Sequence, residues 1–242
     1  MKVLIQSSLH RKIFILSILV TGYALAFSQP VINALPRWMF TASGYYGVPQ
    51  SPIDKFVDTE QWGYSAELQY RLQYNKPFLG GIFYNESTLS RYVLKYTQTS
   101  GIGDVNVREK ANTRRLEVGL SAAFYPEINW LLQPYLIGRA GVAIFQTSSI
   151  LTDQDTNESI DRISESTSSA PAYGLDFGIH VVPVIWYLRG DVRVGFSGNT
   201  STDYLILDKK NAGPTGYPID YFVLHSSAGK WLKISIGISY LF

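Results

Sequence analysis

The strongest candidate for a catalytic pair is a histidine that stands two residues before a serine, at His225 and Ser227. A serine nucleophile needs a base within hydrogen-bonding reach and an acid that orients the base. Residues two apart in a β-strand point to the same face, so this pair could meet. Both residues stand at odd positions, however, and so have the same parity as Trp231 and Lys233. We predict that side chains of this parity face a closed interior. We therefore interpret the spacing as chance and expect no catalytic residue and no enzyme.

A second candidate site is a polar segment in which oxygen-bearing side chains recur at alternate positions. Oxygen ligands of this kind suit a hard cation such as Ca²⁺. An EF-hand loop would need a glycine at its sixth position and a glutamate at its twelfth, where this chain has Glu158 and Ser164. We favour a solvated acidic loop and predict no metal site and no cofactor. The alternating residues are Asp153, Asp155, Asn157, Ser159 and Asp161.

The composition excludes several classes of protein. The 242 residues include no cysteine, and 46% are hydrophobic, 17% are charged and the formal net charge is +2. The absence of cysteine excludes disulfide scaffolds, cysteine zinc sites and thiol catalysis. The near-neutral charge gives no electrostatic basis for binding nucleic acid. The 17 Tyr, 12 Phe and 5 Trp favour a β-rich protein.

The first residues, 1–28, have the organisation of an export signal. A basic start precedes the apolar run 13–20, and small residues that suit signal peptidase follow it. The apolar run is shorter than the ~20 residues that a membrane-spanning helix needs. We predict that the signal is cleaved after Ala26 or Ser28 and that a single domain follows over 29–242.

The remaining chain is dominated by apolar and polar residues that alternate with a period of two, most clearly over 62–74. A helix would spread both kinds around its circumference, whereas a strand separates them into two faces. The pattern predicts eight strands, of which the one from Phe78 is ambiguous because its apolar residues fall on both faces. The strands are expected at about 37–47, 62–74, from Phe78, 115–124, 135–144, 173–181, 186–196 and 232–242.

The predicted connections alternate in length, so that all short turns lie at one end of the sheet and all long loops at the other. An even number of strands with this arrangement is the plan of a bacterial outer-membrane barrel. We therefore predict an all-β fold, a closed eight-stranded antiparallel up-and-down transmembrane β-barrel. The short turns are expected at 75–77, 126–129 and 182–184, and the long loops at 48–61, about 98–110, 146–170 and 198–220.

A soluble lipocalin-like barrel also has eight alternating strands, so further features must decide between the two. The polar face carries charges of both signs at mid-strand, and the chain stops inside its last strand at an aromatic residue. The tryptophans lie near strand ends, which predicts two aromatic girdles at the membrane–water boundaries. The predicted girdles contain Trp38, Trp130 and Trp186 at the short-turn end and Trp62 and Trp231 at the loop end.

Eight strands leave an interior just wide enough for side chains to fill, and charges buried there must pair. We expect a network of ion pairs that closes the lumen, with an ion path as the alternative. Neighbouring strands are expected to bring Arg189, Asp191 and Arg193 close to Asp176, and Glu117 toward Arg139. The predicted network consists of Glu67, Arg71, Arg115, Glu117, Arg139, Asp176, His180, Arg189, Asp191, Arg193 and Lys233.

The end of the chain resembles the closing strand of outer-membrane β-barrel proteins, which typically ends in Phe. The residues that carry this resemblance are Ile238, Tyr240 and the terminal Phe242, in alternation with polar residues. The overall plan resembles the small OmpA/OmpX-type barrels and covers nearly all of the mature chain. The resemblance implies that the barrel-assembly machinery reads this end during biogenesis.

The His225–Ser227 spacing is similar to the His-x-Ser pair of lipid A deacylases, which are also eight-stranded outer-membrane barrels. An Asn follows the Ser in that family, and this chain has Ala228 there. A deacylase site must also be turned toward lipid, whereas this pair is predicted on the lumen face.

The function predicted from the sequence is a monomeric, integral outer-membrane barrel with a closed lumen and a structural or interaction role. Its expected partners are outer-membrane lipid, the barrel-assembly machinery and other outer-membrane or extracellular proteins that its loops contact, but not nucleic acid. The alternatives are a narrow channel for small solutes, a lipid A-modifying enzyme and an accessory subunit of a larger complex.

Overall fold

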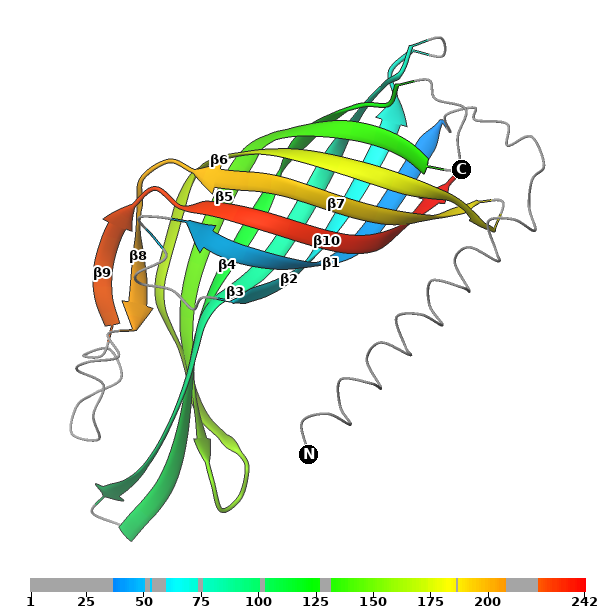
Figure 1. Ribbon diagram of the computed structural model, residues 1–242. Coiled ribbons are helices and arrows are strands. Elements are labelled where there is room, and N and C mark those ends of the chain that lie inside the picture. Colours follow the sequence, from blue (N-terminus) through cyan, green and yellow to red (C-terminus); the bar gives the residue numbers. More distant parts are fainter. Residues whose placement is uncertain are drawn as a thin grey trace, which may run out of the picture.

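The protein, seen in a computed structural model, is built from β-strands (Figure 1). The structure describes residues 37–50, 53, 60–73, 76–100, 103–126, 132–185, 187–207 and 222–242. The predicted export signal over 1–28 lies outside these ranges. Within them, no helix has both the length and the apolar composition that a membrane crossing requires.

Eight of the ten described strands close into an antiparallel barrel, in the order β1-β10-β7-β6-β5-β4-β3-β2. This confirms the predicted fold class. The strands are β1 (Trp38–Gln50), β2 (Gln61–Arg71), β3 (Phe78–Ser100), β4 (Gly103–Phe124), β5 (Leu132–Asp153), β6 (Ser159–Ile185), β7 (Leu188–Asn199), β8 (Thr202–Leu207), β9 (Phe222–Ser227) and β10 (Lys230–Leu241).

The first and last strands of the chain join to close the barrel. β1 pairs with β10 in an unbroken antiparallel register from Met39↔Leu241 to Gln50↔Lys230. Trp38 and Phe242 extend this ladder, because each donates its backbone N–H to the carbonyl of the other. Every barrel strand therefore has two neighbours in the closed wall, whereas the extensions of β3 beyond Ser87 and of β6 before Ala172 pair on one side only.

The predicted facing of the side chains is confirmed. Ile236 and Leu120 point outward and are 70% and 68% exposed, whereas the neighbouring Ser235 and Ser121 are buried inside. The ambiguous strand is also resolved, since Phe78 and Ile82 point outward while Leu79 and Phe83 are buried in the interior. Both faces of β3 carry apolar residues near its start because the lumen contains an apolar layer at that level.

Two of the predicted long loops are mostly strand, which corrects the prediction from the sequence. β3 and β4 stay paired from Phe78↔Phe124 as far as Ser100↔Gly103, across most of the predicted loop 98–110. β5 and β6 pair over most of 146–170 in the same way. These extensions are rich in Thr, Ser, Val and Tyr, which are compatible with a sheet. The prediction of loops rested only on the polarity of the two segments. Figure 1 shows both hairpins projecting beyond the barrel.

The predicted short turn at 182–184 also falls later in the chain, since β6 continues through these residues to Ile185. Pro183 suggested a turn, but a register shift between Val181 and Ile185 accommodates it. A proline lacks the backbone donor of a regular ladder, and such irregularities are where it is tolerated.

The predicted loop 198–220 contains a further strand. β8 pairs with β9 in a separate two-stranded sheet. This hairpin contacts the barrel at its loop end, where the hydroxyls of Thr113 and Thr147 donate to the carbonyl of Leu205 at 3.3 and 3.4 Å. The hairpin therefore packs against the inner face of the extended strands, where Thr113 and Thr147 are buried.

His225 and Ser227, which were predicted near the loop end of the last barrel strand and on its lumen face, lie in this hairpin. His225 pairs with Tyr204 of β8, and Ser227 is the last residue of β9. The chain leaves strand conformation at Ala228 and resumes it only at Lys230. The parity that the pair shares with the lumen-facing residues of β10 is therefore not a shared barrel face.

Candidate functional site: the barrel interior

The barrel interior has three layers, and the outer two are apolar. At the short-turn end the buried cluster contains Met39, Leu79, Ala123, Tyr125, Tyr135, Ile137 and Leu241. At the loop end it contains Ile53, Leu89, Ala143, Phe145, Ala172 and Trp231. Charged side chains fill the space between these layers, because the inward positions of the central strand segments are polar in the sequence.

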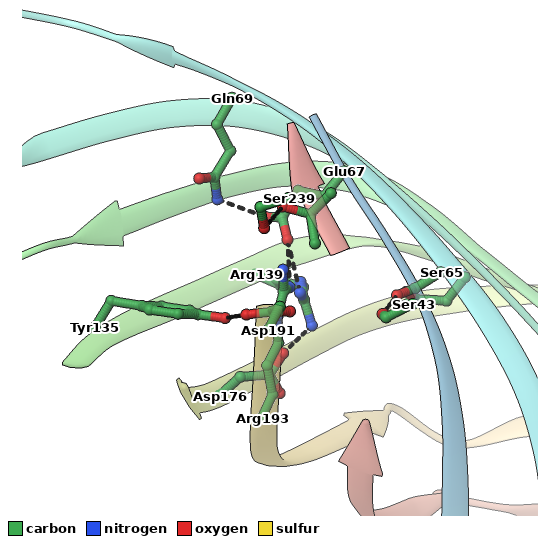
Figure 2. Close-up of polar contacts among 12 residues, drawn as sticks. Ser43, Ser65, Glu67, Gln69, Tyr135, Arg139, Asp176, Asp191, Arg193 and Ser239 are labelled. Carbon is green, nitrogen blue, oxygen red and sulfur yellow. Dashed lines mark hydrogen bonds and ion pairs between the residues drawn. The ribbon is translucent and has the colours of Figure 1, made fainter. Parts of the chain in front are cut away.

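Glu67 lies at the centre of the charged layer (Figure 2). One carboxylate oxygen of Glu67 accepts from Arg139 at 2.8 Å and from Arg193 at 2.7 Å. Arg139 also donates to Asp176, and the Nε of Arg193 donates to Asp191 at 2.6 Å. These residues come from β2, β5, β6 and β7, so the network ties opposite sides of the wall together through the lumen.

Glu117 is the centre of a second group of charges nearer the loop end. It forms ion pairs with Arg115 and, at 3.1 Å, with the Nζ of Lys233, and it accepts from Asn85 at 2.8 Å. The guanidinium of Arg115 stacks 3.7 Å from the centre of the Trp231 ring. A desolvated cation over a Trp face is a favourable contact, and here it joins the charged layer to the apolar layer above it.

His180 is fully buried at the opposite end of the charged layer. Its Nε2 lies 3.3 Å from Asp191 and 3.2 Å from the hydroxyl of Ser239. The imidazole packs on the rings of Tyr125 and Tyr135, with centroid distances of 5.5 and 4.5 Å. His180 is therefore held by packing and hydrogen bonds on several sides.

The structure brings the predicted network residues into one interior but changes some of their predicted partners. Glu117 pairs with Arg115 and Lys233, and Arg139 pairs with Glu67 and Asp176, so the expected Glu117–Arg139 pair is wrong. Arg189 donates to Gln133. Side chains reach across a lumen this narrow, so adjacency in the wall does not determine the partner. Arg71 lies on the lumen-facing side at the end of β2, where it is partly exposed.

Neutral residues of the network were missed from the sequence. The amide of Gln69 donates to Glu67 at 2.8 Å, and Tyr135 donates its hydroxyl proton to Asp191. Asn85 and Gln133 complete the contacts of Glu117 and Arg189. The inward positions of Gln69, Gln133 and Tyr135 were readable from the sequence, since each of them stands between outward apolar residues.

The space left between the charged side chains is very small. Two central cavities measure about 10 Å³ each, and Arg139 and Asp176 line both of them. A cavity of about 10–15 Å³ is the minimum that holds one water molecule. Neither central cavity therefore provides a continuous column of water.

The outer surface is an apolar band between two rings of aromatic side chains. At the short-turn end the ring of Trp38 contacts that of Tyr70 and the ring of Phe78 contacts that of Phe124, both in tilted arrangements, at centroid distances of 4.6 and 5.2 Å. At the loop end the aromatic pairs are Tyr46–Trp62, Tyr64–Tyr84 and Tyr173–Phe196.

The predicted tryptophan girdles are confirmed at Trp38 and Trp62, both exposed on the outer face. The girdle position predicted for Trp231 is wrong, because its side chain is 1% exposed and fills the interior against the guanidinium of Arg115. Trp130 and Trp186 lie outside the described residues. Tyrosine and phenylalanine supply most of the two rings.

The described residues contain no group of three or more His, Cys, Asp or Glu side chains that could hold a metal ion. In the acidic turn, Asp153 accepts from the backbone N–H of Asp155 at 2.8 Å, and the side chain of Asn106 reaches Asp155 at 3.4 Å. These carboxylates thus stabilise the turn between β5 and β6.

No protein-family model and no curated protein matches this sequence. Three solved structures share its architecture at low identity. Neisserial surface protein A is 11% identical with a TM-score of 0.45, covering 85% of this chain and 97% of that one. OprG from Pseudomonas aeruginosa is 13% identical with a TM-score of 0.44, covering 86% and 97%. Ail of Yersinia pestis is 10% identical with a TM-score of 0.41, covering 86% and 99%. In fold, the chain is similar to small outer-membrane barrels.

Proposed function

We propose that this protein is an exported, integral outer-membrane barrel whose lumen is closed and whose hairpins serve a structural or interaction role. The observation that carries the proposal is the combination of an apolar outer band with a charged and fully packed interior. A water-soluble barrel would reverse this arrangement, because its outer face must be polar. The proposal includes removal of residues 1–28 on export.

The height of the outer band supports a bilayer-spanning role. Trp38 and Tyr46 mark the two aromatic rings on β1 and are eight residues apart. Eight residues of strand extend about 26 Å, and the usual strand tilt reduces this to about 20 Å along the barrel axis. This height is comparable to that of the apolar band of outer-membrane barrels, which is about 25 Å tall.

The layered interior supports a role other than conduction. Solutes would have to pass two apolar layers and the Glu67–Arg139–Arg193 bridge between them. Breaking a buried bridge of this kind costs several kcal/mol because it leaves uncompensated charge. The β3–β4 and β5–β6 hairpins then offer the most extended surface for partners.

We further propose that the last strand is the signal read during barrel assembly. Ile238, Tyr240 and Phe242 all project from the outer face, where an assembly factor in the membrane plane has access to them. His225 and Ser227 have no catalytic role in this proposal. Expression in cells should accordingly leave the mass of lipid A unchanged.

Two measurements test the proposed function, one in cells and one on the purified protein. The protein should fractionate with the outer membrane and run faster on a gel before boiling than after it, as closed barrels do. In planar bilayers it should insert without stable single-channel openings. Recovery as a soluble periplasmic protein would contradict the membrane assignment, and reproducible open-pore currents would favour the channel.

A further inference from the structure

Basic side chains gather on the outer face of β3 and β4, just beyond the aromatic ring at the loop end. Over the described side chains of 86–97 and 106–114, the outward positions carry five cations, while Glu86 is their one acid. Arg114 lies 3.4 Å from Glu86. The basic patch, as we call it, consists of Arg91, Lys95, Arg108, Lys110 and Arg114.

A β-bulge creates this patch. The register between β3 and β4 shifts between Thr88 and Ser90, and Leu89 is fully buried on the inner face. An extra residue in one strand re-aims every side chain beyond it. Beyond the bulge, Arg91 and Lys95 therefore share the outer face with the cations of β4.

The patch holds like charges against one another. Lys95 and Arg108 stand directly opposite in the register of β3 and β4. Side chains in such a pair are about 4.5–5.5 Å apart at Cβ, and like charges there destabilise the sheet. The Nε of Arg108 is in addition buried without a hydrogen-bond partner. An anion bound between these side chains would remove both penalties.

An apolar hollow opens across β1, β2, β3 and β4 just below the patch. It has a volume of about 450 Å³. Tyr64 and Tyr84 stand between the hollow and the patch, and both donate their hydroxyl protons to Glu86, which Arg114 also contacts. The outward side chains that line the hollow are those of Phe40, Ala66, Leu68, Ile82, Tyr84 and Val118.

We propose that the hollow and the basic patch together bind one phosphorylated glycolipid, with an acyl chain in the hollow and its phosphates on the cations. This site rests on the proposed function, since it needs the outer band to lie in a membrane. From Arg114 to Arg108 the patch extends six residues, or about 20 Å along the strand. A phospholipid headgroup layer is only about 5–8 Å thick, so a lipid whose phosphates are carried on sugars fits the patch better.

The test uses the full chain in phosphatidylcholine nanodiscs, titrated with diphosphorylated lipid A and followed by native mass spectrometry. Each basic residue near an anionic surface contributes about fivefold in affinity, so Lys95→Gln/Lys110→Gln should bind about 25-fold more weakly. The matched control is Lys76→Gln/Lys230→Gln, two exposed cations outside the patch, which should bind as the unaltered chain does. Lipid A stripped of its phosphates should lose affinity for the unaltered chain to a comparable degree.

A second arm tests the hollow. Ala66→Phe would fill it and should weaken binding of lipid A, whereas Ala140→Phe, on the outer face of β5, should not. Equal affinities of the two lysine double variants would overturn the proposal, as would equal binding of lipid A with and without phosphates. Phosphatidylglycerol or dextran sulfate that binds as tightly as lipid A would also overturn it, in favour of a general anion surface. Insertion into nanodiscs without lipid A binding rejects only this site, whereas failure to insert rejects the proposed function as well.

Discussion

Glu67 and Arg193 meet across the lumen at 2.7 Å although β1 and β10 separate their strands in the barrel wall. The same carboxylate oxygen also accepts from Arg139. Opposite sides of the wall are therefore held together by one acidic side chain. This explains why an interior with so many charges is stable, because each charge in the bridge has a partner and the lumen excludes competing water.

Glu67→Gln should destabilise the folded barrel strongly. The substitution keeps the shape of the side chain but leaves Arg139 and Arg193 without their shared carboxylate, and breaking a buried pair costs about 3–5 kcal/mol. Urea titrations of folding into liposomes would measure the change. Glu60→Gln, at an exposed acid, is the matched control and should shift the midpoint little. Similar midpoints for the two variants would show that the central bridge contributes little to stability.

Gly195→Ala should weaken the same network from the wall. A Cβ at Gly195 would lie 1.7 Å from a carboxylate oxygen of Asp176, so Asp176 would have to move away from Arg139. Overpacking of this kind typically costs about 1–3 kcal/mol. Gly190→Ala provides the comparison, since the nearest atom to its Cβ would be 3.6 Å away. The prediction fails if both variants unfold at the same urea concentration.

The apolar band can be tested by placing an arginine at different heights on the outer face. Ile236→Arg should cost about 2–4 kcal/mol because its side chain faces the bilayer near mid-height. Val93→Arg also faces outward but lies beyond the loop-end aromatic ring, where the penalty should fall to about 0–1 kcal/mol. Folding titrations into liposomes compare the two. A larger penalty at Val93 would mean that the membrane lies elsewhere on the barrel.

The sequence predicts this fold well because the facing of a side chain in a strand depends only on parity. Parity alone therefore assigns Ile236 and Lys233 to opposite faces. The ion-pair partners were not predictable in this way, since Lys233 reaches Glu117 across the lumen and no local pattern records that distance. The girdle assignment of Trp231 was wrong because it followed from the position of this residue at a strand end, whereas the side chain fills the interior, as its parity with Lys233 predicts.

The lengths of the strands and the basic patch were missed for a related reason. Beyond the loop-end aromatic ring, polar and apolar residues occur on both faces of β3 and β4, so these strands lose the contrast on which the prediction depended. The bulge at Leu89 then reverses the parity of β3, and only the register of the folded strands shows that Arg91 and Lys95 join the cations of β4.

The last prediction is that truncating one large side chain in either apolar layer leaves the barrel non-conducting. Trp231→Ala removes the largest side chain of the loop-end layer, but Tyr125 and Tyr135 still close the short-turn end. Tyr125→Ala opens the short-turn layer in the same way while Trp231 remains in place. Either change should cost about 3–5 kcal/mol of stability, as large-to-small substitutions of buried aromatic residues do. The Glu67 and Glu117 ion pairs lie between the layers in both variants and keep the water-sized cavities separate. Planar bilayer recordings of each variant should therefore show no stable openings. Steady currents from Trp231→Ala alone would show that the loop-end layer is the only barrier, and that the charged layer conducts once it is uncovered.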